Sequence, residues 1–275
     1  MASRWFDSPL TAFNAFVLKD PGGRRIARDL AYGRHERQQL DLYAPRRPAE
    51  GARLPVIAFF YGGSWASGVR QGYGFVGRAL AARGFLVAVA DYRLVPEVRF
   101  PAFVEDAAAA VRWLIGHAAE HGGDAGRVVL MGHSAGAYNA AMAALDPQWL
   151  GAERSRIAGL IGLAGPYDFL PLSGAVTKAA FGAAEDLEAT QPVRFAGEGA
   201  PRTLLLHGGQ DRTVLPRNSK RLAKAIAAAG GEARLKIYPQ LGHVAILTAL
   251  ALPFRYRAPV LADAVGFARE VCRER

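Results

Sequence analysis

RVVLMGHSAG, residues 127–136, is the stretch that decides the expected fold. It begins with a continuously apolar run, which is typical of a strand buried on both faces of a parallel sheet. It ends in two glycines with a serine, Ser134, between them. Because the next residues, AYNAAMAAL (137–145), have the composition of a helix, Ser134 is predicted to stand on a tight strand-to-helix turn, a nucleophile elbow.

The same alternation of apolar runs and helical patterns continues on both sides of this stretch. We expect further strands at 55–63, 85–93, 157–165, 201–209 and 233–243, and helices at 72–84, 100–123 and 219–231. Strands that alternate with helices predict the α/β class, with a mostly parallel sheet and helices on both faces. The partly alternating stretch 35–45 suits an antiparallel edge strand.

No repeat or linker divides the 275 residues, so we expect a single domain over 1–275. Residues 1–30 are expected to form an N-terminal extension or cap. Within them, 9–18 suit an amphipathic surface helix that could dock on a partner or a membrane. Residues 167–200 have weak helical signals and several Gly and Pro, which predicts a small lid.

A serine hydroxyl needs a base to act as a nucleophile. In a parallel sheet, side chains that follow the carboxyl ends of strands meet along one edge. His243 follows the last expected strand and is the last of six histidines. We therefore expect His243 to be the base. We expect His133 to point away from the turn, and His207 to be packed or hydrogen-bonded.

An acid that orients the base has to lie between Ser134 and His243 and follow a strand. Asp211 and Asp168 both qualify. Asp211 is favoured because its strand lies nearer to the last one, whereas Asp168 is the alternative, with a turn or helix-cap role as its simpler explanation.

Backbone N–H groups that bind a developing oxyanion require close approach of the chain, which glycines allow. The segment YGGSW (61–65) follows the expected strand at 55–63. We therefore expect an oxyanion hole from Gly62, Gly63 and Ser64, completed by the N–H of Ala135 directly after the serine.

Composition excludes several other classes of protein. The chain has 34 Lys and Arg against 24 Asp and Glu, a formal net charge of +10, but no dense basic run interleaved with aromatic residues. We therefore expect no nucleic-acid partner. The sequence contains no run of about 18 apolar residues without a charge, so no membrane span is predicted. Cytoplasmic localisation is the default expectation. The one cysteine, Cys272, excludes an intrachain disulfide and is expected to be structural, and no spacing predicts a metal site or another cofactor.

Several motifs together resemble one superfamily. They are LDLYAP (40–45), YGGSW (61–65), DYRLVPE (91–97), GHSAG (132–136), HGGQD (207–211) and GH (242–243). This set resembles the α/β-hydrolase superfamily, and within it the esterases of the hormone-sensitive-lipase-like and BD-FAE groups and their arylformamidase relatives. The resemblance covers about residue 30 to the C-terminus.

One position departs from the pattern of these families. Tyr61 stands where the oxyanion motif usually opens with a histidine, so the way in which that loop is held is in question. The resemblance also implies that Asp91 and Arg93 brace this region, with an ordinary surface ion pair as the alternative.

The residues and the resemblance lead to one expected function. It is a serine carboxylesterase that hydrolyses short-chain esters of small-molecule substrates through an acyl-enzyme. One alternative is an arylformamidase-like amidohydrolase, and another is a hydrolase fold that serves as a non-catalytic receptor or scaffold. Whether the chain forms a homodimer is left open.

Overall fold

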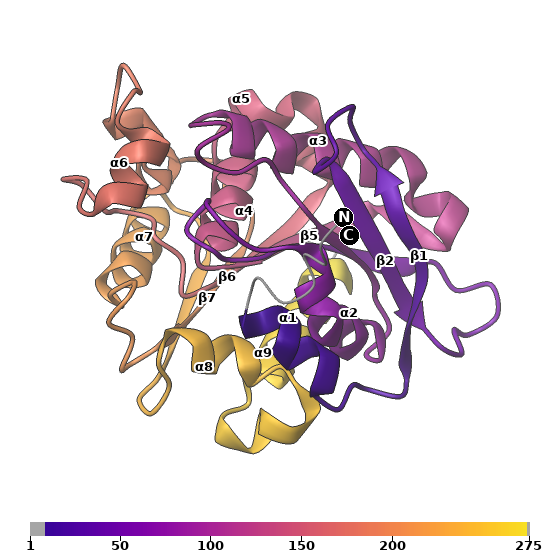
Figure 1. Cartoon of the computed structure of the whole chain (residues 1–275). Coiled ribbons are helices and arrows are strands. Elements are labelled where there is room, and N and C mark those ends of the chain that lie inside the picture. The colour runs from indigo at the N-terminus through magenta and orange to yellow at the C-terminus, as the bar shows by residue number, and fades with distance from the viewer. Residues whose placement is uncertain (1–8, 274–275) are drawn as a thin grey trace.

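The computed structural model describes residues 9–273, and their centre is one eight-stranded sheet (Figure 1). Its strand order is β1-β2-β4-β3-β5-β6-β7-β8. The strands are β1 (Gly23–Ala31), β2 (Gln39–Pro45), β3 (Leu54–Phe60), β4 (Leu86–Ala90), β5 (Gly123–His133), β6 (Ile157–Leu163), β7 (Thr203–Gly208) and β8 (Ala233–Tyr238). Strands β3 to β8 run parallel, and β2 pairs antiparallel with both β1 and β4. The predicted α/β class with a mostly parallel sheet is confirmed.

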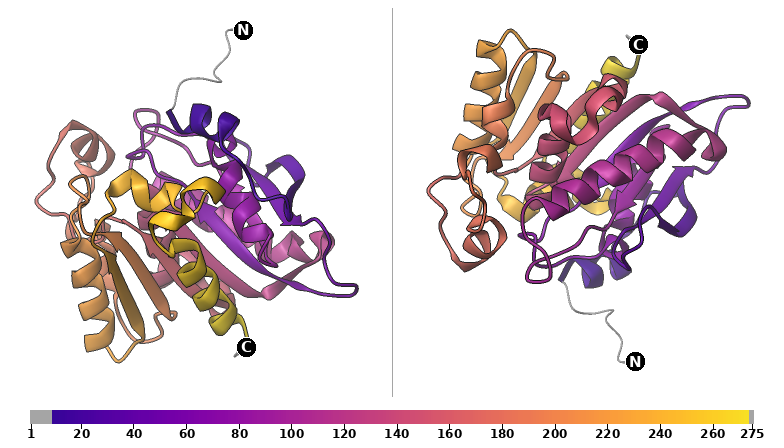
Figure 2. Two further views of the ribbon diagram at one scale, coloured as in Figure 1. Left: turned by 90° about the horizontal axis from the view of Figure 1, so that it is seen from below. Right: turned by 90° about the horizontal axis from the view of Figure 1, so that it is seen from above.

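Helices cover both faces of this sheet (Figure 2). One face carries α2 (Gly74–Ala81) and α9 (Val260–Arg273), and the other carries α3 (Ala102–His117), α4 (Ala135–Leu145) and α7 (Arg217–Ala228). The remaining α-helices of the described residues are α1 (Pro9–Phe16), α5 (Pro147–Leu150), α6 (Ala175–Phe181) and α8 (His243–Thr248). The 3-10 turns are η2 (Arg70–Tyr73), η3 (Ala118–His121), η4 (Gly151–Arg156), η5 (Glu188–Thr190), η6 (Pro192–Phe195) and η7 (Leu252–Arg257).

Strand β5 shows why its sequence is apolar without interruption. Val129 and Met131 belong to the apolar cluster under α2 and α9, whereas Val128 and Leu130 belong to the cluster under α3, α4 and α7. Successive side chains of a strand point to opposite faces, so a strand between two helical layers has to be apolar at every position. This burial fixes β5, and with it the position of the turn that follows.

The two N-terminal strands differ from the sequence-based expectation. Residues 35–45 were expected to hold an edge strand, but β2 lies second in the sheet and β1 forms the edge. Residues 23–31 are therefore part of the sheet and not of an extension. The sequence GRRIARDLA of β1 does not indicate a strand, because most of its side chains are polar and are exposed or half-buried. An ion pair of 3.0 Å between Arg25 and Asp41 helps to hold β1 against β2.

Two segments cover the carboxyl edge of the sheet. Residues 167–200, for which the sequence predicts a small lid, form α6 and two 3-10 turns beside α7 (Figure 1). Helix α1 packs on the body of the molecule: Thr11 is buried, and the amide of Asn14 bonds to the carbonyl of Gln71 and the N–H of Phe75. No helix within residues 9–273 has the length and apolar character needed to cross a membrane. Cys272 is buried in α9.

Candidate active site

Ser134 stands at the junction of β5 and α4. Its backbone has φ 54° and ψ −125°, a conformation that residues other than glycine rarely adopt. A Cβ atom on Gly132 would lie 2.3 Å from the carbonyl oxygen of Gly136, and one on Gly136 would lie 2.1 Å from that of Phe60. The turn therefore requires both glycines, because it packs directly against neighbouring backbone.

Ser134, His243 and Asp211 form one hydrogen-bonded chain. Nε2 of His243 lies 2.8 Å from Oγ of Ser134, and Nδ1 of His243 lies 2.7 Å from Oδ2 of Asp211. Ser134 follows β5, Asp211 follows β7, and His243 opens α8 after β8. The carboxyl edge of the parallel sheet thus brings together side chains that are distant in sequence. With Nδ1–H donated to the carboxylate, Nε2 is free to accept the proton of the serine hydroxyl.

The Asp211 carboxylate is buried and accepts several hydrogen bonds. Its Oδ1 accepts the N–H groups of Thr213 and Val214, each at 2.9 Å, and its Oδ2 lies 3.3 Å from Nε2 of His207. Burial acts to raise the pKa of this carboxyl. The hydrogen bonds from His207, His243 and the Val214 N–H outweigh burial and hold the pKa of Asp211 well below its usual range. The group that faces His243 is therefore a carboxylate.

Asp168, the alternative acid, lies elsewhere. Its Oδ2 accepts a hydrogen bond of 2.8 Å from Nη1 of Arg221 in α7. The geometry gives it the role of an ion-pair partner that joins the lid segment to α7. His207 is fully buried, with Nδ1 2.7 Å from Oγ of Ser219, as expected of a hydrogen-bonded core histidine.

The expectation that His133 points away from the turn is wrong. Its Nε2 lies 2.9 Å from the carbonyl oxygen of His243, and the two imidazole rings are 4.9 Å apart. Burial, followed by the neighbouring His243, lowers the pKa of His133 to about 3. Its ring is therefore neutral and donates Nε2–H to that carbonyl. Strand alternation does not reveal this contact, because the partner is backbone that follows another strand.

The loop after β3 approaches Ser134 with its backbone. A Cβ atom on Gly62 would lie 2.8 Å from Cβ of Ser134, so only glycine allows this approach. Gly63 and Ser64 then take positive φ angles of 139° and 52°. Ala135 lies in the first turn of α4, where N–H groups have no carbonyl partner within the helix. The loop after β3 and the first turn of α4 therefore both lie beside the nucleophile.

Tyr61 holds this loop in place. Its hydroxyl donates a 2.5 Å hydrogen bond to Oδ1 of Asp91 and accepts one of 2.8 Å from Arg37. Its ring stacks with those of Tyr73 and Tyr92, at centroid distances of 4.8 and 5.1 Å. Burial, then the nearby Asp91, raises the pKa of Tyr61 well above its usual value, so the hydroxyl keeps its proton. The tyrosine that departs from the resembled motif thus anchors the loop.

Of the two residues expected to brace this region, Asp91 does so and Arg93 does not. Asp91 accepts the N–H of Arg70 at 2.7 Å and also pairs with its guanidinium. Arg70 in turn bonds to Asp41 of β2 at 3.0 Å, which links the loop to the antiparallel end of the sheet. Arg93 instead pairs with Asp106 of α3 at 2.8 Å. The sequence did not point to Arg70, because its role is evident only from the buried carboxylates that it contacts.

Two hollows meet at Ser134. The first, of about 420 Å³, is lined by His243, by Leu10 and Phe13 of α1, and by the loop YGGSW (61–65), which is called the oxyanion loop below. The second, of about 630 Å³, lies under the lid, with Phe169 among its apolar lining residues. Helix α1, which lies within the stretch expected to form an N-terminal extension or cap, is therefore a wall of the site.

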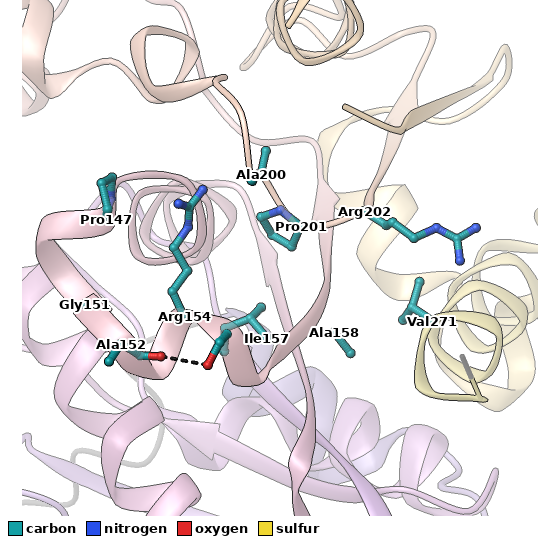
Figure 3. Close-up of a pocket in the computed structure, with 12 residues that line it drawn as sticks. Pro147, Gly151, Ala152, Arg154, Ile157, Ala158, Ala200, Pro201, Arg202 and Val271 are labelled. Atoms are coloured by element: carbon teal, nitrogen blue, oxygen red, sulfur yellow. Dashed lines mark hydrogen bonds between the residues drawn. The ribbon is translucent and has the colours of Figure 1, made fainter. Parts of the chain in front are cut away.

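A further hollow of about 570 Å³ lies away from this site, near the start of β6 and β7 (Figure 3). Arg154 and Arg202 line it, and Arg202 is paired with Glu232. None of the side chains predicted to act in catalysis lies there. Within residues 9–273, no group of three or more His, Cys, Asp or Glu side chains is arranged to hold a metal ion.

A comparison with known protein families identifies the family of this chain. The family model described as BD-FAE matches residues 40–226. The chain belongs to the BD-FAE family. This confirms the resemblance found in the sequence.

The probable isoprenylcysteine alpha-carbonyl methylesterase ICME of Oryza sativa subsp. japonica is 30% identical over 243 residues, which cover 80% of this chain and 58% of that protein. The chain thus spans less than two thirds of that relative's length.

Two solved structures are similar over most of both chains. Esterase 2 of Thermogutta terrifontis with butyrate bound is 25% identical, with a TM-score of 0.72 over 91% of this chain and 95% of that one. A truncated carbohydrate esterase from gut microbiota has a TM-score of 0.79 at 20% identity, over 93% of this chain and 99% of that one, which supports the fold.

Proposed function

We propose that this BD-FAE family member is a serine carboxylesterase that hydrolyses short-chain carboxylic esters through an acyl-enzyme. The observation that carries the proposal is the hydrogen-bonded chain from Ser134 Oγ through His243 to Asp211, at 2.8 and 2.7 Å. It supplies a nucleophile, a base and a carboxylate that orients the base, all beside backbone donors.

Acylation begins when Oγ of Ser134 attacks the ester carbonyl and its proton passes to Nε2 of His243. The N–H groups of Gly63, Ser64 and Ala135 stabilise the oxyanion of the tetrahedral intermediate. His243 then gives the proton to the alcohol oxygen, the C–O bond breaks, and the acyl group stays on Ser134.

Deacylation repeats these steps with water. His243 takes a proton from water as it attacks the acyl carbonyl, and returns that proton to Ser134 Oγ when the carboxylic acid leaves. The buried negative charge of Asp211 stabilises the imidazolium in both halves of the reaction.

Similar proteins support both parts of the proposal. The rice relative is described as a probable methylesterase, and esterase 2 of T. terrifontis has been solved with butyrate bound and phosphoramylated by tabun. Modification by organophosphates is a property expected of an activated serine.

Labelling tests the nucleophile. A fluorophosphonate should add one mass increment to the wild-type chain and abolish its hydrolysis of 4-nitrophenyl butyrate. Ser134→Ala should neither react nor hydrolyse the ester while it unfolds at the wild-type temperature. Labelling that persists in Ser134→Ala, or a wild-type chain that is inert toward every ester, would overturn the proposal.

A chain-length profile tests the short-chain preference. Each buried methylene contributes at most about 0.8 kcal/mol, so a groove built for long chains would show kcat/KM that rises with every added carbon. We expect a maximum between 4-nitrophenyl acetate and hexanoate, and lower values for octanoate and palmitate. N-formylkynurenine, assayed in parallel, should react more slowly than the best ester. A maximum at octanoate or beyond would contradict the short-chain assignment.

A further inference from the structure

The two hollows at Ser134 differ in which catalytic groups line them. His243 lines the hollow beside α1 but not the hollow under the lid, whereas Ala135 lines the hollow under the lid. In the proposed reaction His243 has to protonate the leaving alcohol. The alcohol therefore has to lie in the hollow beside α1, which His243 lines. The hollow under the lid is therefore the side for the acyl group, and is called the acyl hollow below.

The charged residues that line the acyl hollow are both basic. Arg212 and Arg217 line it, and no acidic residue does. Both arginines are exposed. In the described part of the chain, neither arginine has a hydrogen bond or an ion pair with a carboxylate. The acyl hollow therefore offers two guanidinium groups that have no acidic partner among residues 9–273.

Acidic residues close to the acyl hollow are occupied or line another surface. Asp168 pairs with Arg221 at 2.8 Å, and Asp211 is buried and bonds to His243. Glu185, Asp186 and Glu188 line a neighbouring hollow, which shares Leu170 and Pro171 with the acyl hollow. Nothing in these contacts neutralises Arg212 and Arg217.

The rest of the lining suits a short aliphatic chain. Phe169 and Leu170 of the lid and Trp65 of the oxyanion loop provide apolar surface between Ser134 and the protein surface. A few methylene groups could lie against them, and an anionic group beyond could then meet a guanidinium, which binds carboxylates with paired N–H donors.

We propose that the preferred substrates are monoesters of short dicarboxylic acids, with the free carboxylate held by Arg212 and Arg217. This inference rests on the proposed esterase function and names its substrate class. The reaction is unchanged: the ester bond is cleaved at Ser134, while the distal carboxylate only binds.

Two esters that differ only at the chain end test the inference. Mono-4-nitrophenyl glutarate and 4-nitrophenyl pentanoate have the same number of methylene groups between the ester carbonyl and the last carbon, which is a carboxylate in one and a methyl group in the other. The quantity measured is the ratio of their kcat/KM values, at low and at high salt.

Arg212→Gln/Arg217→Gln should lower this ratio by about tenfold, from the loss of two charge-assisted contacts. High salt should lower the ratio in the wild-type chain and have less effect in the variant, because salt screens exposed charges. Arg24→Gln, which removes an exposed arginine of β1, is the matched control and should leave the ratio unchanged.

The possible failures are distinguishable. Hydrolysis of pentanoate with a ratio that is insensitive to the double substitution would overturn the inference and leave the esterase function intact. An equal fall of the ratio in Arg24→Gln would show a general charge effect and overturn it as well. If arginine dependence instead appears with 4-acetoxybenzoate, whose carboxylate is on the leaving alcohol, the assignment of the acyl side is wrong. A wild-type chain that hydrolyses no ester would refute the proposed function itself.

Discussion

The hydroxyl of Tyr61 lies 2.5 Å from Oδ1 of Asp91, and this bond joins the loop beside the nucleophile to the end of β4. Asp91 is held in turn by Arg70, so the loop is attached to a buried ionic network. In the proposed reaction this loop contributes backbone donors that stabilise the oxyanion of the transition state. Its anchoring should therefore affect kcat more than KM.

Tyr61→Phe tests this link. The substitution keeps the ring between Tyr73 and Tyr92 but removes the hydroxyl that bridges Asp91 and Arg37. We expect kcat for 4-nitrophenyl butyrate to fall by about tenfold, with KM changed little, because a loosened donor stabilises the oxyanion less well. Tyr256→Phe, which changes a tyrosine that is 81% exposed, is the control. An unchanged kcat in a folded Tyr61→Phe protein would show that stacking alone holds the loop.

Asp211→Asn should impair catalysis far more than Asp168→Asn. The carboxylate of Asp211 orients His243 and stabilises its cation, and loss of such an acid can lower kcat by about 10⁴. Asp168→Asn removes a surface ion pair with Arg221, so its effect on kcat should be less than about threefold. Both are measured with 4-nitrophenyl butyrate after circular dichroism has shown native folding. A larger loss in Asp168→Asn would mean that the acid comes from β6.

The central part of the site could be predicted from the sequence because the sheet itself positions it. Ser134, Asp211 and His243 each follow a strand whose apolar run is visible locally. Parallel strands place their carboxyl ends along one edge, whatever the distance in sequence. The glycines on either side of Ser134 indicate a tight turn, since a Cβ atom at either position would collide with backbone.

The supporting parts could not be predicted, because they depend on contacts between distant segments with no local pattern. Arg70 opens the short turn η2, and its role appears only when Asp41 and Asp91, 29 and 21 positions away, are brought to it. The contact of His133 with the His243 backbone spans 110 positions. Polar strand β1 likewise gives no apolar alternation from which to infer a strand.

Glu270 provides a pH-dependent test away from the active site. It accepts hydrogen bonds of 2.7 and 2.6 Å from Arg234, and another from Arg202. These bonds lower the pKa of Glu270 from 4.5 to about 2. Since the folded-state pKa is the lower one, the carboxylate stabilises the folded chain fully above about pH 4.5, and this contribution disappears as the pH falls through about 2.

The stability difference between the wild-type chain and Glu270→Gln should follow that dependence. We expect the wild-type Tm to be higher at pH 6, and the difference to shrink steadily between about pH 4.5 and 2. Glu120→Gln, at an exposed position in η3, is the control for a general effect of charge. A Tm difference that grows toward low pH would have the wrong sign and would refute the ionic role of Glu270.

Phe13 of α1 should determine which alcohols the site accepts. Its ring packs edge-on against Phe75 at 5.2 Å and near Phe254 at 5.7 Å, and it lines the hollow that His243 also lines. If the alcohol leaves on the side of His243, a large aromatic alcohol buries apolar surface against Phe13, and a small one does not reach it. Phe13→Ala should therefore lower kcat/KM for 1-naphthyl acetate by about tenfold relative to ethyl acetate, because part of that apolar contact is lost. Phe16→Ala is a matched control on the same helix, since Phe16 is 84% exposed and does not line this hollow. Equal losses on both esters in Phe13→Ala would show that α1 supports the fold without contacting the alcohol. A loss confined to longer acyl chains would place the acyl group, and not the alcohol, beneath α1.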